Sequence, residues 1–292
     1  MVDVVPHDKQ TVRLLIMCPR CGLGNRLRTM VSAVYLANTY RLQLAHLWFK
    51  DAPLSSKYLY PDEVLGTSQC DFETLFEPIP FFPPFSNQGQ RMRLLTEHEN
   101  LGLNKGLNIV DEVQTQKLPD DEHWKGVDAV AVLTSLGFHI NPKQKIHFYQ
   151  KYFQPRAEFT ETINACAEIS KGKWLCLHLR EKVRQGSGFE AWNMDEVANV
   201  ISATLEENHF DRIIVFSDSE DAKTEFMKYR FRHTPVYSIK WETEDYIQNM
   251  FLDFLAMSRA SLILNSGISS FPAEAALFGG GVPHRDLLYE SL

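Results

Sequence analysis

The sequence has no long hydrophobic run and no excess of positive charge. No stretch approaches the ~18 consecutive apolar residues of a membrane helix, and the N-terminus lacks the basic segment and apolar run of a signal peptide. Lys and Arg number 30 against 37 Asp and Glu, a net charge of −7. A general nucleic-acid binder needs clustered cations, so this balance argues against one. We predict a cytoplasmic protein without a membrane segment, or a protein of the secretory-pathway lumen if this chain is a piece of a longer one.

Cysteine is also scarce. The five cysteines, Cys18, Cys21, Cys70, Cys166 and Cys176, are irregularly spaced, and their odd number argues against a disulfide framework. The first two form a C-P-R-C motif before an expected helix, an arrangement that lowers the thiolate pKa in thiol oxidoreductases. A structural zinc site would need two more ligands, and no second C-x-x-C exists. Buried cysteines in a tight turn are therefore the first interpretation, and redox chemistry is the alternative.

The composition is that of a globular protein of mixed structure. The 292 residues are 44% hydrophobic and 23% charged, as in ordinary globular chains, and this length favours two domains of ~150 residues. Short runs rich in β formers alternate with segments of helical periodicity. Such alternation implies parallel strands joined by right-handed crossovers. We predict two α/β domains of the doubly wound kind, residues 1–155 and 156–292, facing a cleft.

The periodicity predicts the following elements. The expected strands cover 12–17, 42–48, 128–133, 174–179, 212–216, 236–239 and 261–264. The expected helices cover 25–40, 146–153, 197–205, 220–229, 246–257 and 272–277. The proline-rich stretch 49–125 is less regular, and we expect excursions and short strands there.

A glycine turn, G-L-G-N-R-L, follows the first expected strand at residues 22–27. A dinucleotide-binding turn would have a third glycine where Leu27 stands and an acid about twenty residues later. Both are absent, and so is the Gly-Lys-Ser/Thr of the ATP-binding loop. The turn still presents backbone N–H groups of a helix start to an anion or a sugar. Gly22 and Gly24 are thus candidate binding residues, with a simple strand-to-helix turn as the alternative.

Two further motifs follow the expected ends of strands in the second half. His178 and Arg180 fall on one face of strand 174–179 because side chains alternate along a strand. Ser217 and Asp218 follow the next strand. Ligands of open α/β sheets bind outside the carboxyl ends of strands, and arginine binds phosphate bidentately. The alternatives are a surface arginine and an ordinary helix cap.

The last motif is a turn of small residues after strand 261–264. Ser269, Ser270 and Phe271 lead into a helix with proline in its first turn, where hydroxyls and free N–H groups suit a diphosphate. Asp253 lies one helix upstream, and its carboxylate can accept two hydrogen bonds from the N1–H and N2–H of guanine. An ordinary surface acid is the alternative interpretation for Asp253.

The order of these motifs resembles the fucosyltransferase superfamily, which includes the protein O-fucosyltransferases and the core α1,6-fucosyltransferases. The chain has G-L-G-N-R-L, then H-L-R, then F-S-D-S, and finally D-F-L-A-M-S-R-A-S-L-I-L-N-S-G-I-S-S-F. The resemblance implies the GT-B fold, two Rossmann-like domains with parallel sheets around a cleft. It also implies a GDP-fucose donor, a glycan or protein acceptor, inversion at the anomeric carbon, and no cofactor or metal.

The resemblance also implies roles for individual residues. Arg180 matches the arginine that neutralises the β-phosphate of the leaving group, and His178 its neighbour that contacts the nucleotide. Asp253 matches the acid that reads guanine, and Asn25 the asparagine that faces the donor sugar and the acceptor. No Asp-x-Asp metal pair is found, so an arginine would have to stabilise the departing diphosphate. The residues that match the diphosphate-holding turn are Ser269, Ser270 and Phe271.

The sequence departs from the family pattern after Arg180. The family often has an acid three residues later, whereas this chain has Arg184 nearby and its acid displaced to Glu181. The catalytic base is not assigned, and Asp51 is the nearest acid after strand 42–48. Three alternatives stay open: a transferase for another nucleotide sugar such as GDP-rhamnose, a thiol oxidoreductase, and a sugar-nucleotide-binding module without catalysis.

Overall fold

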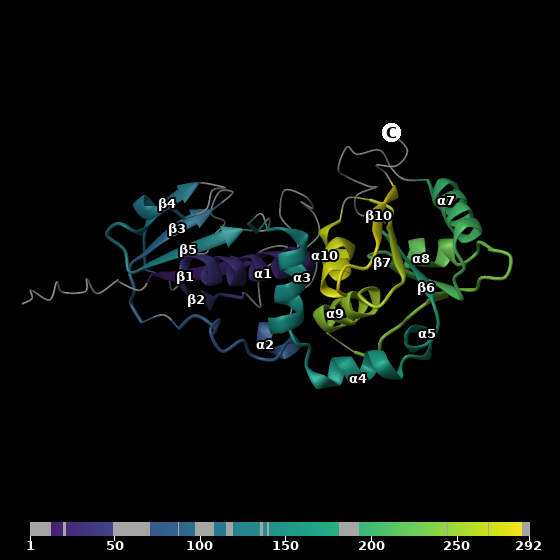
Figure 1. Cartoon of the computed structure of the whole chain (residues 1–292), viewed down its shortest axis with the longest axis horizontal. Helices are drawn as coiled ribbons and strands as arrows, with labels where there is room; N and C mark the ends of the chain where they lie inside the picture. Colours follow the sequence, from purple (N-terminus) through teal and green to yellow (C-terminus); the bar gives the residue numbers. More distant parts are fainter. Residues whose placement is uncertain are drawn as a thin grey trace, which may run out of the picture.

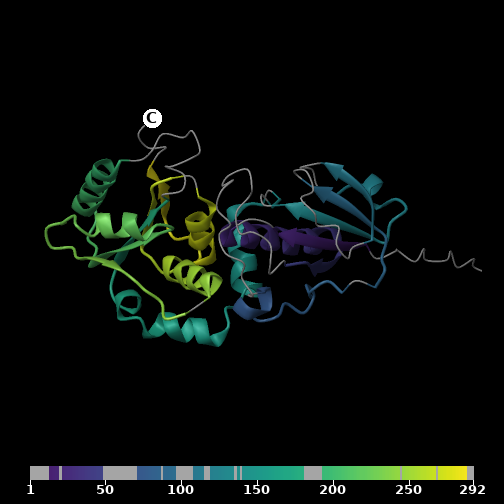
Figure 2. The ribbon, with the colours of Figure 1, turned by 180° about the vertical axis from the view of Figure 1, so that it is seen from behind.

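The computed structural model contains two parallel five-stranded sheets, placed at opposite ends of the long axis of the molecule (Figures 1 and 2). Helices α3, α9 and α10 lie between the sheets in both views, and α1 lies along the first sheet. The residues that the structure describes are 13–19, 22–48, 71–86, 88–96, 108–114, 119–134, 137–138, 140–180, 193–243, 245–267 and 269–287.

The first sheet belongs to the N-terminal half, and all of its strand pairs are parallel. Its strand order is β2-β1-β5-β3-β4. Strand β1, between β2 and β5, is buried almost throughout, as a strand covered on both faces must be. The strands are β1 (Leu14–Pro19), β2 (Gln43–His46), β3 (Met92–Thr96), β4 (Ile109–Gln114) and β5 (Ala129–Thr134). The helices of this half are α1 (Leu23–Tyr40), α2 (Phe72–Leu75), the 3-10 helix η1 (Asp121–Trp124) and α3 (Pro142–Tyr152).

The second sheet has the order β10-β9-β6-β7-β8 and is also parallel. The chain runs outward from β6 to β8 and then returns to the other side of β6 with β9. The sheet therefore has its switch point between β6 and β9, where ligands of such sheets bind. The strands are β6 (Trp174–Leu179), β7 (Arg212–Ser217), β8 (Val236–Ser238), β9 (Leu262–Asn265) and β10 (His284–Asp286). The helices are α4 (Ala157–Ala165), α5 (Ala167–Ser170), α7 (Met194–Glu207), α8 (Glu220–Phe226), α9 (Tyr246–Met257) and α10 (Ser270–Phe278).

Every strand and helix expected from periodicity is present, most of them with shifted ends. The expected helix 146–153 begins earlier, because the Asn141 side chain caps it and Pro142 occupies its first turn. The expected helix 197–205 also begins earlier, at Met194, after the cap Asn193. Polar first turns carry no apolar periodicity, so the pattern placed both starts too late.

Several elements were not predicted. The short strands β3 and β4 confirm the expectation of short strands within 49–125. In contrast, α2, η1, α4, α5 and β10 were missed because each is short or lacks a clear apolar period. Strand β10, for example, reads His-Arg-Asp and lies at the sheet edge. Strand β5, the last of the first sheet, ends at Thr134, and β6, the first of the second sheet, begins at Trp174. The predicted boundary at 155 lies between these two strands.

The two halves share the largest hydrophobic cluster, and each half also has a smaller cluster of its own. The shared cluster runs from Leu15 in β1 to Ala276 in α10. Aromatic rings join the halves: Phe76 stacks on Phe72 at 4.9 Å between centroids and meets Phe251 of α9 edge-on at 4.8 Å. Burial of apolar surface is the dominant favourable term in folding, so the same interior stabilises both sheets.

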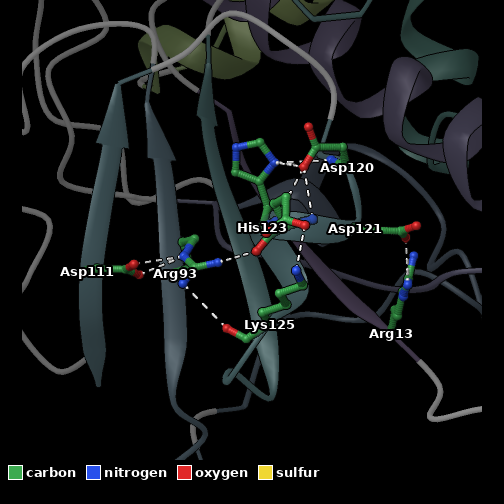
Figure 3. A network of polar contacts seen from close by, with 8 residues as sticks. Arg13, Arg93, Asp111, Asp120, Asp121, His123 and Lys125 are labelled. Carbon is green, nitrogen blue, oxygen red and sulfur yellow. Dashed lines mark hydrogen bonds and ion pairs between the residues drawn. The ribbon is translucent and has the colours of Figure 1, made fainter.

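A network of polar side chains covers the outer strands of the first sheet (Figure 3). Arg93 Nε donates to both carboxylate oxygens of Asp111, at 2.9 and 2.8 Å, and its Nη1 donates to the Glu122 carbonyl at 2.7 Å. These bonds tie η1 to β3 and β4. Exposed pairs of this kind contribute little to stability, so the network serves to position η1.

A buried ion pair joins α3 to α10. Lys145 Nζ lies 2.7 Å from Glu274 Oε1, and the Tyr149 hydroxyl donates to Glu274 Oε2 at 2.8 Å. The side chains of Lys145 and Glu274 are only 11% and 4% exposed. Burial and the Glu274 charge raise the pKa of Tyr149 well above its ordinary value. The triad therefore fixes α10 against the N-terminal half.

Lys145→Met is expected to destabilise the protein by about 3–5 kcal/mol, because it leaves the Glu274 carboxylate buried without its cation. Urea unfolding at pH 7 measures the loss. The double variant Lys145→Met/Glu274→Gln removes both charges and is expected to lose less than Lys145→Met alone. A double variant as unstable as the single one would contradict this account.

Candidate functional site

A cavity of about 730 Å³ lies where the first turn of α1 meets the carboxyl ends of the second sheet. Its volume falls within the range of small-molecule and cofactor sites. The N-terminal half contributes residues 22–25, and the C-terminal half contributes the rest of the lining. The cavity thus opens at the switch point between β6 and β9.

Every predicted binding or catalytic residue that the structure describes lines this cavity. They come from separate motifs as far apart in the chain as residues 22 and 271, and the fold brings them together. They are Gly22, Gly24, Asn25, His178, Arg180, Ser217, Asp218, Asp253, Ser269, Ser270 and Phe271. Four residues that the sequence also raised, Cys21, Asp51, Glu181 and Arg184, lie outside the described residues.

Arg180 follows β6 directly and is held by two other segments. Its Nη1 lies 2.8 Å from Asp218 Oδ2, and its backbone N–H donates to Ser266 Oγ at 3.0 Å. The Arg180 side chain is 24% exposed, whereas that of Asp218 is 7% exposed. The buried carboxylate therefore orients a guanidinium that remains accessible from the cavity. A guanidinium is always charged and matches phosphate geometry.

His178 lies in β6, two residues before Arg180, and is buried. Its hydrogen bonds define its tautomer. Nδ1 lies 2.9 Å from Asn265 Oδ1. Asn265 Nδ2 donates to Asp286 Oδ1 at 2.6 Å and to the Gly267 carbonyl, so Oδ1 is the acceptor and His178 Nδ1 carries the proton. Burial lowers the pKa of His178 to about 4. The ring is therefore neutral near pH 7, with Nε2 as a hydrogen-bond acceptor.

The first turns of α1 and α10 touch at the cavity. Ser270 Oγ donates to Asn25 Oδ1 at 2.6 Å, and Arg28 Nη2 donates to the same oxygen at 2.9 Å. Neither bond uses the Asn25 amide N–H groups. A Cβ on Gly24 would stand 2.7 Å from the Phe271 Cα. Glycine is therefore needed for this approach, which brings two helix N-termini, each a favourable place for an anion, to the same cavity.

Asp253 lies on the cavity-facing side of α9. Trp241 Nε1 donates to its Oδ1 at 2.7 Å. Burial raises the pKa of Asp253 to about 7, while Trp241 and Lys223 act to lower it and Glu220 to raise it. Asp253 is therefore an acceptor whose negative charge is disfavoured by burial and favoured by any ligand that donates hydrogen bonds to it.

Sequence reasoning missed several lining residues, among them Lys223, Lys240, Trp241 and Tyr246. Lys240 and Trp241 follow β8, so the rule that ligands bind at carboxyl ends of strands could have found them. Tyr246 lies seven residues before Asp253 on α9, and this helical spacing places both side chains on one face. Nothing in the sequence indicated that Lys223 faces the cavity, because a lysine is common in an amphipathic helix.

The surroundings of Cys18 are the opposite of those of a reactive thiol. Its side chain is buried in the first sheet, and burial raises its pKa to about 12. Thiol oxidoreductases instead depend on a lowered cysteine pKa. This result favours the interpretation of Cys18 as a structural cysteine. Within the described ranges, no three His, Cys, Asp or Glu side chains are grouped as a metal site would require, and no helix there is long and apolar enough to span a membrane.

The fold and the cavity together define the GT-B class, two Rossmann-like parallel sheets with a ligand-sized cavity between them. More particularly, the fold is similar to that of solved fucosyltransferase structures. The chain is similar to POFUT1 in complex with GDP-fucose, with a TM-score of 0.61 and 11% identity over 97% of this chain and 99% of that chain.

Two solved structures of NodZ are similar to the same degree. NodZ α-1,6-fucosyltransferase soaked with GDP-fucose has a TM-score of 0.59 and 15% identity over 91% of this chain and 92% of that one. Fucosyltransferase NodZ from Bradyrhizobium has a TM-score of 0.60 and 14% identity over 91% and 93% of the two chains. No protein-family model and no curated protein sequence matches this chain. The likeness therefore rests on the fold.

Proposed function

We propose that the protein is an inverting, metal-independent glycosyltransferase that moves fucose from GDP-fucose to a hydroxyl of a glycan or protein. One observation carries the proposal: the residues predicted from separate motifs line a single cavity. The fold that forms this cavity is similar to that of two solved structures described as a complex with GDP-fucose and as soaked with GDP-fucose. In this proposal the first half forms the acceptor side and the second half holds the donor.

Arg180 stabilises the leaving group. The bond between the fucose anomeric carbon and the β-phosphate oxygen breaks, and its electron pair stays on GDP. Negative charge thus grows on the β-phosphate, where a fixed guanidinium in an enclosed cavity is most effective. Asp218 holds that guanidinium in place. At the start of α10, Ser269 contributes its hydroxyl and Ser270 its backbone N–H group to the diphosphate.

The remaining residues orient the donor and the acceptor. Neutral His178 accepts a hydrogen bond from a nucleotide hydroxyl through Nε2, and Asp253 accepts from the guanine N–H groups. The Asn25 amide group donates to the fucose or the acceptor. The new bond joins the acceptor oxygen to the anomeric carbon from the opposite face, and the acceptor proton leaves to a base. Asp51 stays the candidate for that base.

A thermal-shift panel with GDP, UDP, ADP and their sugars, each with and without EDTA, tests the donor. A ligand present at ~100 Kd stabilises its protein by about 2.7 kcal/mol, and we expect GDP and GDP-fucose to do so whether or not EDTA is present. Selective stabilisation by UDP would overturn the guanine assignment. Loss of stabilisation with EDTA would overturn metal independence.

Product analysis separates the alternatives of other classes. Slow release of fucose from GDP-fucose without an acceptor marks a transferase, whereas binding without any turnover marks a sugar-nucleotide-binding module. Faster turnover of GDP-rhamnose would reassign the sugar. A thiol oxidoreductase would lose its activity in Cys21→Ser, while the transferase is expected to tolerate that substitution.

The affinity for GDP-fucose is expected to rise with pH up to about 7 and then level off. Guanine N–H donors need an ionised acceptor, and the raised pKa of Asp253, about 7, leaves most of the carboxylates protonated at lower pH. Below that pKa, affinity falls about tenfold per pH unit. Calorimetric titrations between pH 5 and 8 measure this slope, and binding at pH 6 should release protons.

The control for this prediction is Asp253→Asn, whose weaker affinity is expected to be independent of pH. GDP-fucose is the suitable ligand because both ends of its diphosphate are esterified, whereas a terminal phosphate titrates near pH ~6. His178, with a pKa of about 4, stays neutral across the upper part of the range. A wild-type affinity that does not change between pH 5.5 and 7.5 would contradict the role of Asp253.

A further inference from the structure

Three segments meet around Asp253 and form one wall of the cavity. Lys223 comes from α8, Trp241 from the segment after β8, and Asp253 from α9, and all three line the cavity. Trp241 Nε1 fixes one carboxylate oxygen of Asp253, but a carboxylate oxygen has more than one lone pair and can accept again. The wall thus presents an acceptor of fixed orientation.

Lys223 is the donor of this wall. Its side chain is only 13% exposed, although its ion-pair partner Glu220, one turn away on α8, is 85% exposed. A pair with so exposed a carboxylate is weak and competes little with a ligand. The charge of Lys223 acts on Asp253, whose pKa it lowers. An ammonium group and a carboxylate therefore face the cavity close together.

This pair matches one edge of guanine. The O6 of guanine is an acceptor, and the N1–H and N2–H groups beside it are donors. Adenine reverses the first two positions, since its N6 amino group donates and its N1 accepts. Resting on the proposed function, we propose that Lys223 donates to O6 of the donor's guanine while Asp253 accepts from N1–H and N2–H. Lys223 is then a specificity-determining residue.

Nucleotide analogues test each contact by itself. In 6-thio-GDP a sulfur, a weak acceptor, replaces O6, whereas IDP keeps O6 and lacks only the N2 amino group. We expect wild-type protein to bind each analogue about tenfold less tightly than GDP, because each loses a hydrogen bond to a charged group. Lys223→Met is expected to bind GDP about tenfold less tightly and to bind 6-thio-GDP as tightly as GDP. Its preference for GDP over IDP should remain.

Lys228→Met is the matched control, because Lys228 is exposed just beyond α8 and does not line the cavity. It makes the same charge change and should keep the wild-type affinities for all three nucleotides. Lys223→Gln, which retains a neutral donor, serves if the methionine variant does not fold, and we expect it to keep a reduced preference for GDP over 6-thio-GDP.

The outcomes separate this inference from the proposed function. Wild-type binding of GDP together with an unchanged ratio of GDP to 6-thio-GDP affinity in both Lys223 variants would overturn the role of Lys223 alone. Failure of wild-type protein to bind GDP would overturn both proposals. Loss of the 6-thio-GDP penalty only when Lys223 is replaced would support the contact to O6.

Discussion

Arg180→Ala is expected to lower turnover of GDP-fucose by about two to three orders of magnitude, the usual effect of removing one fixed donor from a developing negative charge. The side chain lines the cavity and lies 2.8 Å from the buried carboxylate of Asp218. The charge that it stabilises appears only as the sugar–phosphate bond breaks, so kcat should fall more than the affinity for GDP. Steady-state kinetics with GDP-fucose measure both quantities.

Arg93→Ala is the matched control for this variant. Arg93 belongs to the network on the outer strands of the first sheet (Figure 3), and it does not line the cavity. We expect its turnover to equal that of the wild type. Near-normal turnover in Arg180→Ala would refute the assignment of Arg180 to the leaving group.

Gly24→Ala is expected to lower kcat/KM by up to about 10²-fold, since small displacements of aligned groups cost that much. The new methyl group would stand 2.7 Å from the Phe271 Cα and 2.9 Å from its backbone nitrogen. Backbone atoms cannot rotate away, so α1 and α10 must move apart. That movement weakens the bond between Ser270 and Asn25, and overpacking costs about 1–3 kcal/mol of stability.

Gly126→Ala separates lost stability from a displaced site. Gly126 has a φ of +72° and nothing within 4 Å of an added Cβ, so alanine there suffers only backbone strain of about 1–2 kcal/mol. Its kcat/KM should match the wild type despite a lower Tm. If Gly24→Ala also retained full kcat/KM, the contact between α1 and α10 would not position the site.

The sequence was sufficient for elements with a clear apolar period. Helix α9 was predicted with its observed bounds, because apolar residues repeat along it from Tyr246 to Met257. Strand β6 was also predicted as observed, from Trp174 to Leu179. The polar edge strand β10 was missed, because neighbouring backbone rather than its own side chains determines where it lies.

The candidate site could be predicted where residues follow strands or open helices, since chain order then places them at one sheet edge. Arg180 and Asp218 are such residues, one after each of two paired strands. The sequence could not show that Asp218 orients Arg180, nor that Asn265 sets the tautomer of His178. Those roles depend on side-chain contacts across strands, which periodicity does not contain.

The shared interior has a consequence for cooperativity. Rings from both halves, such as Phe76 and Phe251, lie in the largest cluster, so each sheet shares part of its core with the other half, although each also has a smaller cluster of its own. Domains that fold alone have separate interiors. A chain cut at residue 155 would expose Phe76 on one fragment and Phe251 on the other. The halves are therefore expected to melt in a single transition, and the cavity between them is lost only when the whole molecule unfolds.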